Sequence, residues 1–512
     1  MIEVGADIIT IIIVTVYFLA MLGIGFWASK KIKNTEDYLV AGRQLGFWVF
    51  VLLMIGTVCS GMSLLGVAGL GYKAGWPTIW EQVFVPLSIG ICIIFFGVKL
   101  HNVARKAGYI TVQDYLAHRY ESPTALRSLS AVAGIIVSLI YLVGQYTAIS
   151  MVLIWLFGIP LWLALVIATL VTMAYTAIGG LYAVAWASLI QSITLIIGVL
   201  VMAPIIIWKA GGFEAVNNYI ASVNPNLVMP WNPVGAFAPP YVVSFALLLG
   251  LGLACAPHVI NNVLSVRDVK YFKWSPLIAF LVYGVVIFLL KFAGFAGLAM
   301  VKGGEIAART GVANPTDYVI LDALQVSLPT VALWGIFAVI VLAAVMSTTD
   351  RLMLTIGAMF SWDLYKKIIK PDADDRSVLL LSKIVVVVSA VGTMIIAINP
   401  PEMLAILIWM GIGTMLATFA VPLLAGLYWR GATRQGALAS MALGLVAALM
   451  FGFLNYFKIK ALGIDFATIP LHFSAYAFVI SLLAMIIVSL LTKKTSDTVL
   501  DETQTGWYIS KQ

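Results

Sequence analysis

The chain has 512 residues, of which 62% are hydrophobic and only 10% are charged. A soluble domain carries about 25% charged residues, so this composition excludes an ordinary water-soluble enzyme or binding module. The formal net charge is +8, but the charges lie between long apolar stretches, which predicts contact with a lipid bilayer rather than with nucleic acid.

Apolar segments long enough to cross a bilayer follow one another along nearly the whole chain. About 20 residues, at a rise of roughly 1.5 Å each, span a hydrocarbon core of roughly 30 Å. The segments are too long and too continuously apolar for barrel strands, so we expect an all-α integral membrane protein. The thirteen predicted transmembrane helices are about 7–29, 47–70, 78–98, 128–156, 159–178, 184–208, 238–263, 275–300, 330–356, 378–398, 402–428, 435–456 and 470–491.

The positions of Lys and Arg predict the orientation, because cytoplasmic loops carry an excess of these residues. With the N-terminus outside, Lys30 and Lys31 follow the first segment on the cytoplasmic side, and Lys366 and Lys367 follow the ninth. The loops on the other side carry few basic residues. The pattern predicts one multi-pass domain over residues 1–512 in the cell membrane, with an outside N-terminus and a cytoplasmic tail at 492–512.

Two of the predicted helices contain residues that interrupt a helix. The segment 47–70 includes Gly56 and Gly61, and the segment 238–263 includes Gly252 and Pro257. In a helix interior, glycine costs about 1 kcal/mol and proline about 3 kcal/mol relative to alanine. At membrane depth, such breaks release backbone carbonyls that bind a cation or a solute where they line a cavity.

The two interrupted segments are the second and the seventh, and they cross the membrane in opposite directions. Each begins a run of five, so residues 47–208 and 238–428 would form two inverted repeats around a site at mid-membrane, as in secondary transporters. The alternative is that glycine and proline are simply common in membrane helices. The matching positions of the two breaks favour the transporter.

Four motifs, taken in order, resemble the sodium/solute symporter family over nearly the whole chain. They are Glu36–Arg43, Thr111–Tyr120, Gly179–Gln191 and Ala343–Thr348, and with Pro257-His258 they look closest to the pantothenate and proline branches. The resemblance implies the five-plus-five inverted-repeat fold of the leucine-transporter type, with one extra helix before it and two after it.

The resemblance also implies a sodium site between the second and ninth segments. Carried over position by position, the site would use the carbonyls of Gly56, Cys59 and Ala344 and the hydroxyls of Ser347 and Thr348. Sodium is a hard cation that binds oxygen ligands, so the residue types agree with this assignment. The alternative is that the two hydroxyls bond back to carbonyls one turn earlier in their own helix.

The chain departs from the family at two positions. Many members carry an aspartate where this chain has Ser188, and the proline branch carries another where this chain has Val58. The change at Ser188 argues against a second sodium site, whereas the proposed ligands of the main site are all neutral. We therefore expect one sodium ion per cycle, with proton coupling as the alternative.

Polar residues inside the segments are candidates for solute binding in one central cavity, which Glu81 and Tyr146 could also face. The alternative for each is an interhelical hydrogen bond. Two further residues are candidates for coupling: Lys291, unless it reaches the membrane interface, and His258, unless it makes a structural hydrogen bond. The solute-binding candidates are Ser60, Ser63, Gln82, Gln145, Ser188 and Asn261.

The sequence therefore predicts a transporter, not an enzyme, that brings a small polar or anionic solute into the cell with sodium. Carboxylates, amino acids and vitamins such as pantothenate fit this class, and no obligate protein partner is expected. A membrane subunit of an energy-converting enzyme would carry a chain of buried ionisable groups, but Glu81, His258 and Lys291 are widely separated. A solute sensor would need a separate signalling partner, because the cytoplasmic tail is short.

Overall fold

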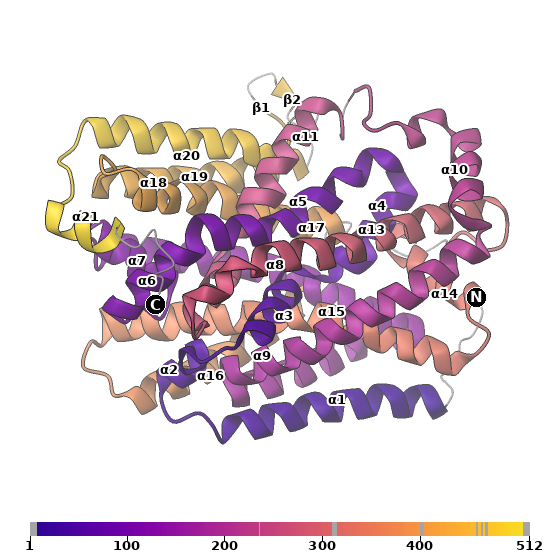
Figure 1. The fold of residues 1–512 in the computed structure, drawn as a ribbon, viewed down its shortest axis with the longest axis horizontal. Helices are drawn as coiled ribbons and strands as arrows, with labels where there is room; N and C mark the ends of the chain where they lie inside the picture. Colours follow the sequence, from indigo (N-terminus) through magenta and orange to yellow (C-terminus); the bar gives the residue numbers. More distant parts are fainter. Residues whose placement is uncertain are drawn as a thin grey trace.

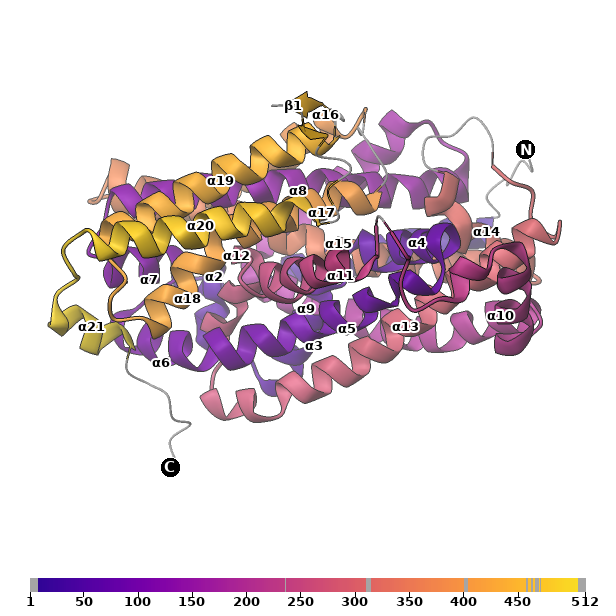
Figure 2. The same cartoon turned by 90° about the horizontal axis from the view of Figure 1, so that it is seen from above.

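The computed structural model describes residues 8–234, 236–309, 315–399, 404–456, 459–461, 464–465, 469 and 471–504. Helices run side by side along the long axis of the molecule (Figures 1 and 2). The helices of the first half are α1 Ile8–Ser29, α2 Thr35–Val40, α3 Phe47–Val58, α4 Val67–Ala74, α5 Glu81–Ile91, α6 Val98–Ala107, α7 Val112–Arg119, α8 Ala125–Phe157, α9 Leu161–Lys209 and α10 Gly212–Val223.

The second half continues the same helical architecture. Its helices are α11 Pro239–Phe245, α12 Pro257–Ile260, α13 Ser275–Lys302, α14 Val319–Ser327, α15 Val331–Ala358, α16 Asp375–Ile396, α17 Leu404–Met415, α18 Val421–Tyr428, α19 Arg434–Tyr456, α20 Phe473–Leu490 and α21 Asp497–Gln504. Two short strands, β1 Lys460–Ala461 and β2 Ile464–Asp465, pair antiparallel between α19 and α20.

Both predicted helix breaks are confirmed. The helix axis bends by 64° between Phe47–Val58 and Met62–Ala74. It bends by 44° between Pro239–Gly252 and Pro257–Ser265. Within the described residues, ten further helices are long and apolar enough to cross a membrane, so the count reaches twelve when each bent pair is one span.

The helix α9 accounts for the thirteenth predicted span. Its 49 residues would be roughly 70 Å long if straight, more than twice the hydrocarbon core. Instead Gly180 takes the left-handed value φ 50°, and residues on both sides of it meet α1. Gln191 Nε2 lies 3.1 Å from Tyr17 Oη, and a Cβ atom added at Gly25 would lie 2.6 Å from Tyr175 Cβ. The chain therefore folds back at Gly180, and the predicted segments 159–178 and 184–208 are its two arms.

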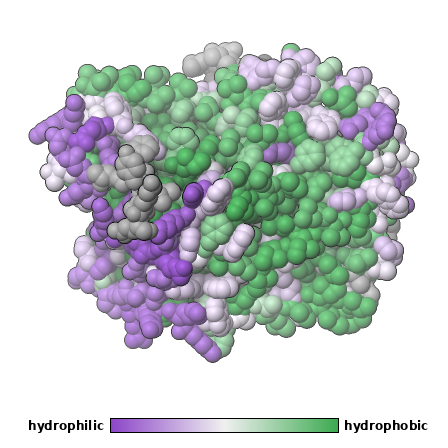
Figure 3. Space-filling view, viewed as in Figure 1, coloured by the Kyte–Doolittle hydropathy of each residue, from purple (hydrophilic) through white to green (hydrophobic). Residues whose placement is uncertain are grey.

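A broad apolar surface surrounds the bundle. Figure 3 shows hydrophobic residues over the middle of the molecule and hydrophilic ones gathered at the end where α2, α6, α7 and α21 lie in Figure 1. Large apolar side chains point outward on helices far apart in the chain, with Trp208 79% exposed and Leu490 73% exposed. Only lipid makes such exposure favourable, so the protein is a multi-pass membrane protein.

Close packing of α13 against α4 holds the second half of the first broken helix. A Cβ atom at Gly294 would lie 2.2 Å from the carbonyl oxygen of Ala68, which is backbone and cannot swing away, whereas a Cβ atom at Gly284 on the same helix meets nothing within 4 Å. We expect Gly294→Ala to destabilise the protein by about 1–3 kcal/mol or more. Gly284→Ala should be neutral or stabilising by up to about 1 kcal/mol. Thermal unfolding of both variants in detergent measures the difference, and equal midpoints would contradict the close approach.

Candidate functional site

The break between α3 and α4 releases consecutive backbone carbonyls. In a continuous helix the N–H groups of residues 60–62 would donate to the carbonyls of residues 56–58. Here they donate instead, in order, to Ser63 Oγ at 3.2 Å, Gln145 Oε1 at 3.0 Å and Ser60 Oγ at 3.2 Å. Side chains thus take the place of the helical acceptors, and the carbonyls at the end of α3 become available to other groups.

The released carbonyls face two hydroxyl groups of α15. Ser347 Oγ donates to Gly56 O at 2.8 Å and lies 2.8 Å from Ala344 O. Thr348 Oγ1 lies 3.0 Å from Gly56 O and 2.9 Å from Cys59 O. The structure therefore brings the five predicted sodium ligands into one cluster of oxygen atoms, which we call the oxygen cluster. It differs from simple back-bonding within α15, because most of these contacts cross from α15 to α3.

The chemistry of the oxygen cluster suits a monovalent hard cation. Its atoms are carbonyl and hydroxyl oxygens without a formal charge, and Ser347 and Thr348 are 1% exposed or less. A hydroxyl group that donates to a carbonyl can turn its lone pairs toward a cation instead. Among the described residues no group of three or more His, Cys, Asp and Glu side chains could hold a metal ion. The donor set thus fits sodium rather than a transition metal or calcium.

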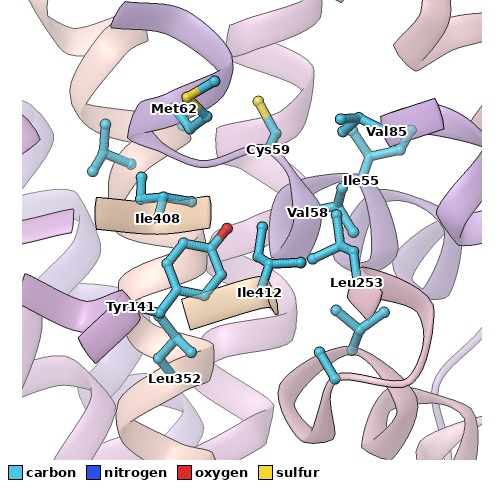
Figure 4. Close-up of a cluster of buried hydrophobic side chains, with 14 of the residues drawn as sticks. Ile55, Val58, Cys59, Met62, Val85, Tyr141, Leu253, Leu352, Ile408 and Ile412 are labelled. Carbon is cyan, nitrogen blue, oxygen red and sulfur yellow. The ribbon is translucent and has the colours of Figure 1, made fainter. Parts of the chain in front are cut away.

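A small cavity of about 20 Å³ borders the break, with room for about one water molecule. Figure 4 shows the Tyr141 hydroxyl pointing between Ile408 and Ile412 toward the stretch that carries Cys59 and Met62. The lining is mostly apolar, and its polar members come from four helical segments. The polar or partly polar lining residues are Ser60, Ser63, Glu81, Tyr141 and Trp409.

The candidate solute ligands divide between this cavity and other places. Ser60 and Ser63 line it, and Ser63 Oγ also lies 2.6 Å from Tyr283 Oη. Gln82 does not line it: with its amide nitrogen turned toward the preceding turn Trp76–Trp80, it donates to the carbonyls of Thr78 and Ile79. Gln82 thus supports the start of α5.

The other three candidates lie away from the cavity lining. Gln145 fixes the break through its bond to the Gly61 N–H group. Ser188 is buried and its hydroxyl has no partner among the described residues; it lies one turn before Ser192, which donates to Leu52 O of α3 at 2.8 Å. Asn261 accepts from the Val112 N–H group at 2.9 Å, at the start of α7.

The two coupling candidates have different surroundings. Lys291 is buried and does not point to the surface: its Nζ atom donates to Glu81 Oε2 at 2.7 Å, and both side chains are 1% exposed. His258 packs edge to face on Tyr141, with ring centroids 5.4 Å apart, and neither ring nitrogen has a hydrogen-bond partner within the part of the chain that the structure describes. Glu81 therefore places one member of a buried ion pair at the cavity wall.

One buried ionic cluster was not predicted from the sequence. Arg127 of α8 bonds to Asp114 of α7 at 2.6 Å and to Asp363, just beyond α15, at 2.9 Å. Trp362 Nε1 donates to Asp114 at 2.9 Å, and Thr111 Oγ1 donates to Asp363 at 2.9 Å. Thr111 and Asp114 belong to the motif Thr111–Tyr120, and this motif is the signal in the sequence that pointed to the region.

Comparison with known proteins gives one consistent family. A profile of the sodium:solute symporter family matches residues 38–444. An osmoregulated proline transporter of Bacillus subtilis is 28% identical over 94% of this chain and 95% of its own. Sodium/pantothenate symporters of Haemophilus influenzae and Escherichia coli are 27% and 28% identical, over 84% and 91% of this chain and 87% and 94% of their own.

A solved structure agrees with these sequence matches in its fold. A sodium-coupled sialic acid symporter, in a substrate-bound outward-open state, superimposes with a TM-score of 0.79 at 18% identity over 96% of this chain and 99% of its own. The predicted fold class, an all-α bundle of the leucine-transporter type, is confirmed.

Proposed function

Because the chain belongs to the sodium:solute symporter family, we propose that it couples inward movement of sodium to uptake of a small polar or anionic solute. The observation that carries the proposal is the oxygen cluster, since it joins α15 to the break after α3, next to a small cavity. Curated relatives that transport proline or pantothenate support the solute class. Gly56, Cys59, Ala344, Ser347 and Thr348 are the proposed sodium ligands.

The position of the oxygen cluster explains how sodium would affect the solute site. Cys59 supplies a carbonyl to the cluster, and Ser60, the next residue, lines the cavity. A cation bound between α3 and α15 would hold the broken stretch in one arrangement, and with it the Ser60 and Ser63 hydroxyls. A ligand shifts the equilibrium between two conformations of a protein only if it binds one conformation more tightly than the other. A cation site formed by two separate helices would bind tightly only in the conformation that brings those helices together.

The remaining features of the proposal concern topology. We place the N-terminus outside and the C-terminal tail in the cytoplasm, supported by the basic residues at Lys30, Lys31, Lys366 and Lys367. The single transport domain is proposed to contain the repeats 47–208 and 238–428, supported by the two bent helix pairs, one at the start of each.

Uptake into proteoliposomes tests the function. Purified protein is reconstituted, an inward sodium gradient is imposed, and uptake of radiolabelled l-proline and pantothenate is measured against a potassium gradient of the same size. The proposal expects concentrative uptake of at least one solute only with sodium, and its loss when a sodium ionophore dissipates the gradient. Uptake that depends on a proton gradient and not on sodium would contradict sodium coupling and indicate proton coupling instead. The His258 ring, which has no partner among the described residues, and the Glu81–Lys291 pair would then be the residues to examine.

A further inference from the structure

The buried ion pair at the cavity wall has spare hydrogen-bonding capacity. Glu81 Oε2 accepts from Lys291, but Glu81 Oε1 is buried and has no partner among the described residues. The Lys291 ammonium group has three N–H donors, of which the described contacts use one. A buried ion pair is stabilising only when its remaining lone pairs and protons are also satisfied, so this pair is incomplete as a purely structural element.

Glu81, and not Lys291, is the member of the pair that lines the cavity. A carboxylate group is acceptor-only, so the wall attracts an ammonium group or another N–H donor and repels a carboxylate group of a solute. Lys291, which does not line the cavity, compensates the charge of Glu81 through the other carboxylate oxygen. Both side chains are 1% exposed, so water does not screen this preference.

A second polar part of the cavity lining adjoins the oxygen cluster. Ser60 lines the cavity, and the preceding residue, Cys59, contributes its carbonyl to the cluster. A cation in that cluster would attract a negative group of the solute toward Ser60. The cavity lining thus includes an acceptor group at Glu81, a hydroxyl beside the proposed cation at Ser60, and apolar side chains such as Val85 and Ile412.

We propose that the solute is a small zwitterion of the amino-acid class, whose ammonium group binds Glu81 and whose carboxylate group faces Ser60. This inference rests on the proposed function and names its substrate class. The apolar lining receives the hydrocarbon part of the solute. Lys291 is a positioning residue, since it holds the Glu81 carboxylate in place without lining the cavity itself. The cavity, at about 20 Å³, is smaller than any amino acid, so the surrounding side chains and helices must move apart for the solute to bind.

Thermal stabilisation of the full-length protein in detergent and sodium tests the solute class. The probes are the standard amino acids, N-acetylproline and pantothenate; the last two carry a carboxylate group but no amine. An amino acid is expected to raise the unfolding temperature while N-acetylproline and pantothenate do not. Stabilisation by pantothenate and by no amino acid would overturn the inference.

A double variant separates recognition from a structural ion pair. Glu81→Gln with Lys291→Gln keeps two side chains that hydrogen-bond to each other and removes both charges. Recognition predicts an amino acid affinity about ten- to a hundredfold weaker, because a charge-assisted bond is lost, with sodium stabilisation unchanged. Unchanged affinity in the double variant overturns the inference.

The matched control removes an ion pair outside the cavity. Arg309→Gln with Asp322→Asn eliminates a bidentate pair at 2.6 and 2.7 Å and should leave amino acid affinity as in the parent protein. If sodium has no effect in any form, but an amino acid binds and loses affinity only in the Glu81 and Lys291 double variant, the sodium-coupled function fails and this inference stands.

Discussion

Replacing Ser347 and Thr348 together by alanine is expected to abolish the stabilisation of the protein by sodium and its sodium-driven uptake. The double variant removes both hydroxyl ligands and leaves the carbonyls of Gly56 and Cys59 without their donors from α15. Each buried carbonyl without a partner costs about 1–3 kcal/mol, so the variant should also unfold at a lower temperature than the parent protein. In the parent, sodium at about 100 times its dissociation constant should add about 2.7 kcal/mol of stability.

Two controls distinguish loss of the ion site from general damage. Thr349→Ala removes a buried hydroxyl at the next position of α15, but this hydroxyl bonds to Val345 O of its own helix at 2.8 Å. Sodium should therefore stabilise Thr349→Ala as it does the parent. Thr348→Ser keeps the ligand oxygen and should retain most of the response. If the unfolding temperature of the double variant still rises with sodium and not with potassium, the oxygen cluster is not the sodium site.

The order of helices and the position of the first break were predictable from the sequence, because both depend on local chemistry. Long apolar runs must be helical in lipid. Gly56 and Gly61 lower the helix propensity of their run by themselves, so the break does not depend on contacts with other segments. The assignment of Ser347 and Thr348 as partners of that break came from the family motif. Spacing alone left open a bond back to their own helix. Ser347 does make that bond, to Ala344 O, and the packing of α15 on α3 adds the contact to Gly56 O.

The surroundings of the polar residues were less predictable, because they depend on side-chain direction and on contacts between distant segments. Lys291 and Glu81 are 210 residues apart, and nothing in either segment indicates that they form a pair. Gln82 follows Glu81 directly, yet its amide group bonds to its own helix while Glu81 lines the cavity. Asn261 was placed with the solute on its polarity alone, and its contact to the Val112 N–H group depends on how α7 packs.

The second large effect, a loss of stability, is expected just beyond the C-terminal end of α15, where Arg127 binds two carboxylate groups. Arg127→Met should destabilise the protein by about 3–5 kcal/mol, because it leaves the buried Asp114 and Asp363 close together without their cation. Methionine keeps the apolar length of the side chain, so the loss reports the charge. Thermal unfolding in detergent, with size-exclusion chromatography to detect aggregation, measures the change.

Arg430 is a matched control, since it also lies between two aspartates. It bonds to Asp501 at 2.9 Å and to Asp497 at 3.3 Å, but its side chain is 54% exposed and theirs are 67% and 91% exposed. Solvent screens such a pair, so Arg430→Met should cost no more than about 1 kcal/mol. Adding Asp363→Asn to Arg127→Met should recover part of the lost stability, because one uncompensated buried charge is removed. If Arg127→Met is as stable as Arg430→Met, the cluster does not hold α7 and α8 to the segment that follows α15.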